Sequence, residues 1–221
     1  MKNILVIAPH PDDEILGCGG TMLKSIREGN NVYVCVVTHA EPPIYPKDAS
    51  LPIQATARAC HQWMGVKKTF FLDFPTVMLE TIDRYKINNA ILNVINETKA
   101  DVVFIPHYGD MQKDHQIVAD ACMVSVRPKY EHKVTAVYGY ETMSETAWNT
   151  PNVQNEFIPN VFVDISEFMA PKLEAMKYYD SQLGSYPDAR SLEAIEALAK
   201  YRGALMHMKA AEAFMCIREL M

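Results

Sequence analysis

An uninterrupted apolar run near the start of the chain, Ile4 to Ile7, ends in the polar segment His10 to Glu14. A run without polar alternation predicts a strand covered on both faces, which is the environment of a central strand in a parallel sheet. Apolar residues at helical spacing follow over Thr21 to Glu28, and a β-branched run follows over Val32 to Val37. Two strand patterns joined by one helical crossover predict a right-handed βαβ unit.

Strand and helix patterns continue to alternate after this unit. We expect strands at 69–72, 102–105, 134–140 and 161–163, helices at 54–64 and 85–98, a helix from about Asp114, and a mainly helical remainder from Ser166. This order is typical of a doubly wound α/β fold, in which helices cover both faces of the sheet. The length of 221 residues fits one domain, so we expect a single domain over 1–221.

The composition excludes several classes of protein. Apolar residues make up 49% and charged residues 22% of the chain, which is typical of a globular domain rather than a disordered one. The net charge of −6, with no clustered basic stripe, argues against a nucleic-acid partner. No apolar stretch reaches the roughly 18 residues that a membrane span needs. The five cysteines are spread without a C-x-x-C pair and the N-terminus carries no signal-peptide pattern, so we expect a cytoplasmic protein with reduced thiols.

Two motifs rich in histidine and aspartate begin where predicted strands end. The first, His10-Pro11-Asp12-Asp13-Glu14, follows the first strand, and the second, His107 to His115, follows the strand at 102–105. Ligands of open α/β sheets bind beyond the carboxyl ends of the strands where the strand order reverses, commonly between the first and fourth strands. We therefore expect the two motifs to face each other across one crevice.

Such a group of imidazoles and carboxylates favours a metal ion. Clustered carboxylates are costly unless a positive charge lies among them, and neutral imidazole with carboxylate is a ligand set that suits zinc. His10, Asp13 and His115 could supply three ligands and leave one position for a water, whose pKa would fall to about 7. Asp12 would then accept the proton of that water as general base. Two imidazoles with one carboxylate also bind iron(II), so Fe2+ is an alternative to Zn2+.

Simpler explanations exist for each feature taken alone. Asp and His are common after strands, and Asp114 could be the N-cap of the helix that follows it. The glycines in Gly17-Cys18-Gly19-Gly20 suggest a dinucleotide fingerprint, but Met22 stands where the third glycine should be. We therefore expect no nucleotide cofactor, and we expect these glycines to let the backbone pass close beneath the site.

The motifs also resemble those of a known family. The first motif with Leu16-Gly17-Cys18-Gly19-Gly20-Thr21, followed by Asp114-His115-Gln116-Ile117-Val118, resembles the PIG-L/LmbE-like deacetylases, and the resemblance extends to segments 71–75, 190–194 and 211–214. It implies a three-layer α/β/α Rossmann-like fold with a mostly parallel twisted sheet. It also implies zinc-dependent removal of an N-acetyl group from an amino sugar or glycoconjugate, chiefly of the N-acetylglucosamine type.

The resemblance assigns roles to individual residues of the two motifs. His10, Asp13 and His115 match the zinc ligands of the family, one ion per chain, and Asp12 matches its general base. Asp110 and Asp114 match carboxylates that orient the ligands.

One position departs from the family pattern. Many members carry a histidine three residues before the last ligand, where this chain has Gln112. The role of general acid therefore does not carry over, because an amide cannot donate a proton to the leaving amine. Asp12 could instead pass on the proton that it takes from water, with His107 or His39 as a fallback, while Gln112 hydrogen-bonds the developing oxyanion.

Candidate sugar contacts lie in the second half of the chain and on the second helix: Glu141, Arg190, Trp148, Tyr140 and Arg58. We expect His61, His132 and His207 to be bystanders. The partner is a small-molecule substrate, and a homo-oligomer is compatible with the sequence. Alternative functions are an amidase acting on a thiol-sugar or antibiotic intermediate, a magnesium-dependent phosphohydrolase using Asp12, Asp13 and Glu14, and a non-catalytic zinc-binding domain. The histidines count against magnesium, which prefers oxygen ligands.

Overall fold

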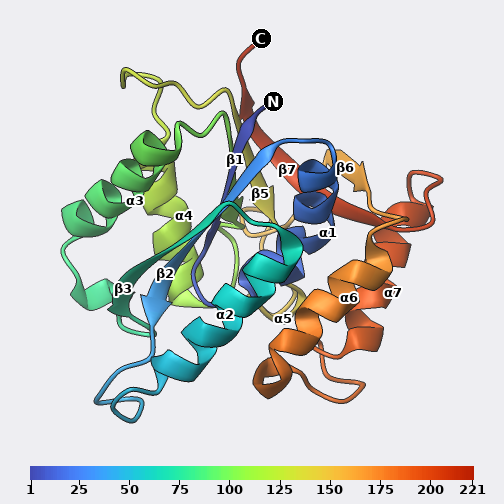
Figure 1. Ribbon diagram of the computed structural model, residues 1–221, viewed down its shortest axis with the longest axis horizontal. Coiled ribbons are helices and arrows are strands. Elements are labelled where there is room, and N and C mark those ends of the chain that lie inside the picture. Colours follow the sequence, from blue (N-terminus) through green and yellow to red (C-terminus); the bar gives the residue numbers. More distant parts are fainter.

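A computed structural model describes all residues, 1–221, and shows one twisted sheet between two layers of helices (Figure 1). The seven strands have the order β3-β2-β1-β4-β5-β7-β6. They are β1 (Asn3–Ala8), β2 (Asn31–His39), β3 (Lys68–Pro75), β4 (Val102–Pro106), β5 (Ala136–Tyr140), β6 (Val161–Asp164) and β7 (Ala211–Glu219). Strands β1 to β5 pair in parallel, and β7 pairs antiparallel with β5 and β6. The expected three-layer, mostly parallel α/β fold is confirmed.

The helices divide between the two faces of the sheet. They are α1 (Asp13–Arg27), α2 (Ser50–Met64), α3 (Arg84–Thr98), α4 (Lys113–Ser125), α5 (Met143–Thr146), α6 (Met169–Tyr178) and α7 (Leu192–Ala204), with 3-10 turns η1 (Leu79–Thr81) and η2 (Asp180–Gln182). Helices α1, α2, α6 and α7 cover one face, and α3 and α4 cover the other (Figure 1). None of the helices is both long and apolar enough to cross a membrane.

The continuous apolar run of β1 is explained by this arrangement. Ile4 and Val6 pack into the core beneath α1 and α6, whereas Leu5 and Ile7 pack into the core beneath α3 and α4. Each buried side chain of this size contributes about 1.5–3 kcal/mol to folding relative to an exposed one. Both faces of the strand therefore select apolar residues.

The first helix begins earlier than expected. It starts at Asp13 rather than Thr21, so the glycine-rich segment lies inside the helix and not in a loop before it. A Cβ on Gly17 would overlap the ring of Tyr140, and one on Gly20 would lie 2.8 Å from Ile165. Helix-breaking residues are present because α1 packs closely against β5 and the segment after β6, a requirement that local propensity does not reveal.

The C-terminal segment is a strand, and the expectation of a mainly helical remainder from Ser166 is wrong there. Residues 211–219 form β7, which inserts between β5 and β6. The first residues of this strand are buried without alternation. A short apolar run of this kind has no period that separates a strand from a helix.

The strand order reverses between β1 and β4. These two strands end just before the two polar motifs, His10 to Glu14 and His107 to His115. The topology thus brings the motifs to the same edge of the sheet, as expected for the crevice of an open α/β fold.

Candidate metal centre and active site

Three side chains of the two motifs converge at this edge of the sheet. His10 lies in the turn after β1, Asp13 is the first residue of α1, and His115 lies in the first turn of α4. One ligand atom from each lies within 4.8 Å of the others. The residues expected as metal ligands are therefore brought together.

Each imidazole is held by a second carboxylate on its far nitrogen. His115 Nδ1 lies 2.8 Å from Asp110 Oδ2, and His10 Nε2 lies 3.1 Å from Asp114 Oδ2. The other ring nitrogens, His115 Nε2 and His10 Nδ1, lie 3.2 Å and 3.1 Å from Asp13 Oδ2. A carboxylate on one nitrogen fixes the tautomer, so that the opposite nitrogen presents a lone pair.

Several buried polar atoms at this point have no hydrogen-bond partner. They are Asp12 Oδ1, Asp13 Oδ1, Gln112 Oε1 and His115 Nε2. Buried polar atoms are nearly always partnered in folded proteins, so a cluster of unpartnered ones indicates a place for an ion or a ligand. Two imidazoles and a carboxylate are a donor set for zinc or iron(II). The residues present therefore fit a divalent transition metal.

Asp114 connects the centre to the loop after β3. Its Oδ2 accepts a hydrogen bond of 2.6 Å from the Val77 N–H in addition to its contact with His10. The N-cap position of α4 is Gln112, and no side chain caps this helix. Asp114 thus orients an imidazole and a loop rather than its own helix.

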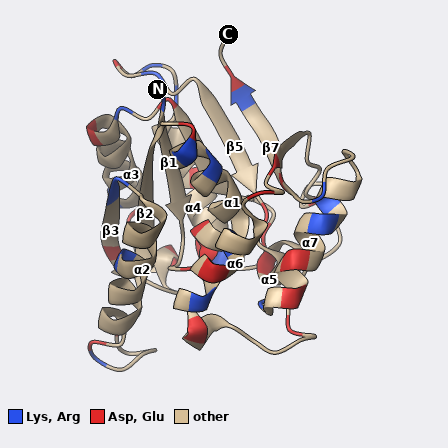
Figure 2. Cartoon of the chain, turned by 45° about the vertical axis from the view of Figure 1, so that its right-hand side comes forward, with Lys and Arg blue, Asp and Glu red and all other residues tan.

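Negatively charged side chains dominate the candidate centre. Burial lowers the pKa of His115, but Asp13 and Asp110 outweigh burial and raise it above its usual value. Burial raises the pKa of Asp13, but His115 and His10 outweigh burial and bring it well below its usual range. Figure 2 shows acidic residues where α1 begins and in α5. The carboxylates therefore favour a positive charge beside Asp13, which a bound metal ion would supply.

Asp12 adopts a strained backbone beside the ligands. Its φ is 113°, a region that residues with a side chain rarely occupy. The side chain is buried, and its Oδ2 lies 3.2 Å from Arg190 Nη1 while Oδ1 is unpartnered. Burial raises the pKa of Asp12, Asp13 adds to the rise, and Arg190 opposes it.

A buried network supports this backbone from behind. Glu14 Oε2 accepts a hydrogen bond of 3.2 Å from the Asp12 N–H. Its Oε1 accepts 2.7 Å from the Tyr179 hydroxyl and lies 3.0 Å from His61 Nε2, whose Nδ1 lies 2.9 Å from Thr69 Oγ1. His61, expected to be a bystander, contacts this network. Sequence patterns could not show this, because the network forms only when α2 and α6 pack against α1.

A cavity of about 380 Å3 opens beside the centre. Its volume falls within the range of small-molecule sites, about 300–1,000 Å3. We call the lining side chains that come from the two motifs, together with Arg190, the motif wall: His10, Asp12, Gln112 and Arg190. We call six further hydroxyl, amide and ring side chains of the lining, from the end of β2 to α2 and from η2, the polar wall: His39, Tyr45, Ser50, Gln54, Ser181 and Gln182.

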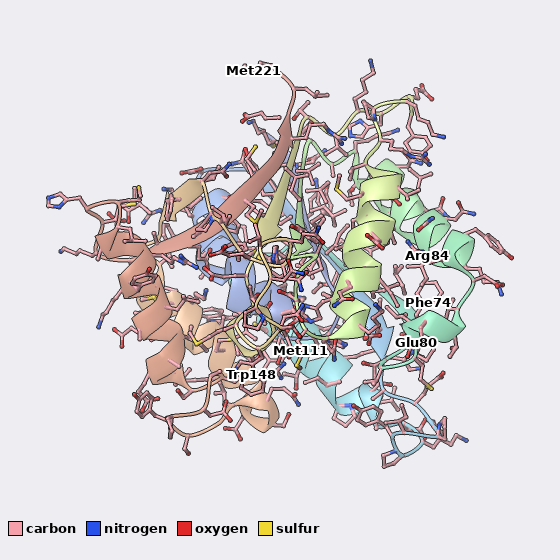
Figure 3. All side chains as sticks on the ribbon, turned by 180° about the vertical axis from the view of Figure 1, so that it is seen from behind. Phe74, Glu80, Arg84, Met111, Trp148 and Met221 are labelled. Carbon is pink, nitrogen blue, oxygen red and sulfur yellow. The ribbon has the colours of Figure 1, made fainter.

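Of the expected sugar contacts, Arg190 alone lines this cavity. Glu141 makes a bidentate ion pair with Arg202, at 2.8 and 2.7 Å, and lines a neighbouring smaller cavity. Trp148 is 63% exposed and lies outside the cavity on the face shown in Figure 3. Arg58 stacks over the Phe71 ring at 4.4 Å and also lies outside it.

Tyr140 and His107 are both buried away from the cavity. The Tyr140 hydroxyl donates to the Ile7 carbonyl at 3.0 Å. His107 Nε2 donates to the Asn155 carbonyl at 2.9 Å, and neither residue lines the cavity. Gln112 does line it, so the structure places the amide and not this imidazole beside the candidate centre.

Comparison with known proteins gives a consistent result. The family profile described as GlcNAc-PI de-N-acetylase (PIG-L) matches residues 5–126. The uncharacterized deacetylase YaiS of Escherichia coli K12 is 28% identical over 189 residues, covering 81% of this chain and 91% of that protein. A diacetylchitobiose deacetylase of Thermococcus kodakarensis is 26% identical over 204 residues, covering 82% of this chain and 70% of that protein.

A solved structure supports the fold. A conserved protein of Thermus thermophilus superposes with a TM-score of 0.80 at 23% identity, covering 100% of this chain and 97% of that one. The resemblance seen in the two motifs is confirmed by the profile match. The chain belongs to the GlcNAc-PI de-N-acetylase (PIG-L) family.

Proposed function

We propose that this protein is a zinc-dependent hydrolase that removes the N-acetyl group from an amino sugar. One observation carries the proposal: two imidazoles, each held by its own carboxylate, direct their free nitrogens toward Asp13, and the adjacent residue Asp12 keeps one buried carboxylate oxygen without a partner. Membership of the family and the deacetylase names of the relatives support the reaction and the substrate class.

His10, Asp13 and His115 would hold the metal, with Asp110 and Asp114 fixing the two imidazoles. A bound zinc ion would polarise the amide carbonyl and make water more acidic at neutral pH. Zinc takes such mixed nitrogen and oxygen ligands, and iron(II) is the alternative for the same set.

Asp12 acts as general base. Its Oδ2 is held by Arg190 at 3.2 Å, whereas Oδ1 has no partner and is available to a water. Asp12 takes a proton as the water oxygen bonds to the acetyl carbon. When the carbon–nitrogen bond breaks, Asp12 returns this proton to the nitrogen, so that acetic acid and a free amine are formed and the Asp12 carboxylate is restored.

Gln112 assists without transferring a proton. Its amide NH2 group would donate a hydrogen bond to the oxyanion that develops on the carbonyl. His107 has no part in this scheme, because its Nε2 already donates to the Asn155 carbonyl and the ring does not line the cavity. Asp12 is therefore the only proton carrier that the scheme needs.

The remaining alternatives differ in how well the site supports them. An amidase acting on a thiol-sugar or antibiotic intermediate would use the same groups, and only substrates separate it from the proposal. A magnesium phosphohydrolase would leave two oriented imidazole nitrogens without a use, because magnesium prefers oxygen ligands. A non-catalytic zinc domain would not need the free, buried oxygen of Asp12.

Metal analysis with an acetate-release assay tests the proposal. Purified protein should contain one zinc or iron per chain, lose activity with a chelator and regain it with zinc. Acetate should be released from N-acetylglucosamine or its oligosaccharides, and p-nitrophenyl phosphate should not be hydrolysed. Protein without stoichiometric transition metal, or with phosphatase activity alone, would contradict the proposal.

A further inference from the structure

Very few charged side chains line the cavity. Among the side chains that line it, Asp12 and Arg190 alone belong to the strongly acidic or basic types, and no lysine is present. The rest of the polar lining consists of hydroxyl, amide and imidazole groups. Recognition of a phosphate or carboxylate normally uses an arginine or lysine that is free to pair with it.

Arg190 is not free for that purpose. Its Nη1 lies 3.2 Å from Asp12 Oδ2, its Nε donates to Ser144 Oγ at 3.1 Å, and its Nη2 lies 3.7 Å from Glu145 Oε1. Two carboxylates therefore already compensate the guanidinium charge. An anionic ligand would have to compete with buried groups that the site needs.

The polar wall is supported by carboxylates as well. Gln54 Nε2 donates to Asp73 Oδ1 at 2.8 Å, and His39 Nε2 lies 3.0 Å from Glu41 Oε2. An anion placed against this wall would meet negative charge behind the first layer of amide and imidazole groups. These partly exposed carboxylates would repel the anion, and added salt would weaken the repulsion.

The hydrogen-bonding groups of the wall suit a different kind of ligand. Hydroxyls and amides such as those of Ser181 and Gln182 both donate and accept, as sugar hydroxyls and acetamide groups do. Gln182 Nε2 now donates to Ser181 Oγ at 3.2 Å, and both groups retain acceptors for a ligand. The wall therefore matches an uncharged saccharide.

We propose that the substrate is an uncharged N-acetyl glycoside, and that the cavity discriminates against amino sugars whose aglycone carries a carboxylate or phosphate. This inference rests on the proposed deacetylation, because it concerns the part of the same substrate that does not react. Gln54 and Gln182 determine the specificity, since each places a neutral amide where an anion-binding enzyme would need a cation.

A matched pair of substrates tests the inference. Two glycosides of N-acetylglucosamine would differ only at the end of the aglycone, which is a carboxamide in one and a carboxylate in the other. The zinc-loaded enzyme should show a kcat/KM at least about tenfold higher for the carboxamide at low salt, and the ratio should narrow as salt screens the repulsion. An equal or higher kcat/KM for the carboxylate would overturn the inference.

Charge substitutions provide the second arm. Gln54→Lys or Gln182→Lys should raise the kcat/KM of the carboxylate relative to the carboxamide by about tenfold, and the neutral control Gln54→Met should leave the ratio unchanged. If neither lysine variant changes the ratio, the inference fails. Calorimetric measurement of the affinity for both compounds separates the two hypotheses. If no acetate is released from either compound, the proposed deacetylation fails. The ratio of the two affinities then tests the preference for the uncharged aglycone by itself.

Discussion

The two walls of the cavity are built in different ways. On the motif wall three of the four side chains are held by charged partners: His10 by Asp114, and Asp12 and Arg190 by each other. On the polar wall every group except the buried Ser50 is half-buried or exposed, and the contacts made there, such as Gln182 with Ser181 and Gln54 with Asp73, are with exposed neighbours. Fixed geometry is what a reacting centre requires, whereas adaptable hydrogen-bonding groups suffice to hold the rest of a substrate.

This difference predicts a division of effects. Changes on the motif wall should lower kcat or metal affinity, because its groups act in the transition state. Changes on the polar wall should alter KM with little change in kcat, because its groups bind ground state and transition state alike.

The largest effect is expected at Asp12. Asp12→Asn removes the proton acceptor but keeps a side chain of the same size beside Arg190. We expect kcat to fall by roughly two to four orders of magnitude with the metal content unchanged. Steady-state kinetics and metal analysis of the same preparation check this. Loss of the metal in the variant would show that Asp12 is a ligand, and the roles of the two aspartates would have to be exchanged.

A smaller effect is expected at Asp110, which orients His115 through the 2.8 Å contact with Nδ1. Asp110→Asn should weaken metal affinity or activity by about 10- to 100-fold. The matched control is Asp120→Asn on α4, the helix that carries His115, where an exposed carboxylate is paired only with Arg84. Equal metal affinities of the two variants, measured by competition with a chelator, would mean that Asp110 does not orient the ligand.

The residues of the candidate centre could be predicted from the sequence much better than the buried residues that hold them in place. The two motifs could be placed together because strand ends and the reversal of strand order follow from simple alternation. The link from Glu14 to His61 and Tyr179 could not be inferred, since it joins α1 to α2 and α6 through packing alone. The strained φ of Asp12 was equally inaccessible, because an N-cap residue normally has an extended backbone.

The fold shows the same limit. The parallel strands from β1 to β4 were expected from their apolar runs and lie where they were expected. The strand β7 was missed because its buried first half lacks alternation. The start of α1 was missed because its glycines oppose a helix locally, although Tyr140 and Ile165 leave no room for larger residues.

The support of Asp12 can be tested at Tyr179. Tyr179→Phe removes the donor of a 2.7 Å hydrogen bond to the buried Glu14 carboxyl. Hydrogen bonds to charged groups are worth about 1.5–3 kcal/mol, so we expect a loss of that size in the free energy of unfolding. Denaturant titration measures it, with the neighbouring exposed Tyr178→Phe as control. Equal free energies of unfolding for the two variants would show that the hydrogen bond between Tyr179 and Glu14 does not stabilise the motif wall.

At Gln112 the expected effect concerns transition-state stabilisation alone. Gln112→Ala should reduce the stabilisation of the transition state by about 1–3 kcal/mol, which would appear as a lower kcat with unchanged metal content. His107→Gln is the comparison within the same motif and should have a mild effect on turnover, because a glutamine can still donate to the Asn155 carbonyl. If His107→Gln instead abolished turnover with the metal bound, His107 would be the proton donor and the role of Asp12 as proton carrier would be wrong.

The smallest effect is expected on the polar wall. Ser181 is exposed, and its hydroxyl accepts a hydrogen bond from Gln182 at 3.2 Å. Ser181→Ala removes one hydroxyl that water or a neighbouring amide replaces at little cost. The rise in KM should therefore correspond to a loss of no more than about 1 kcal/mol in binding free energy. The kcat should not change, because the Ser181 hydroxyl makes no hydrogen bond to the candidate metal ligands, Asp12 or Gln112. Full Michaelis–Menten curves for wild type and variant separate the two constants. A tenfold fall in kcat for Ser181→Ala would show that the polar wall also acts in the transition state, and the contrast between the two walls would then not hold.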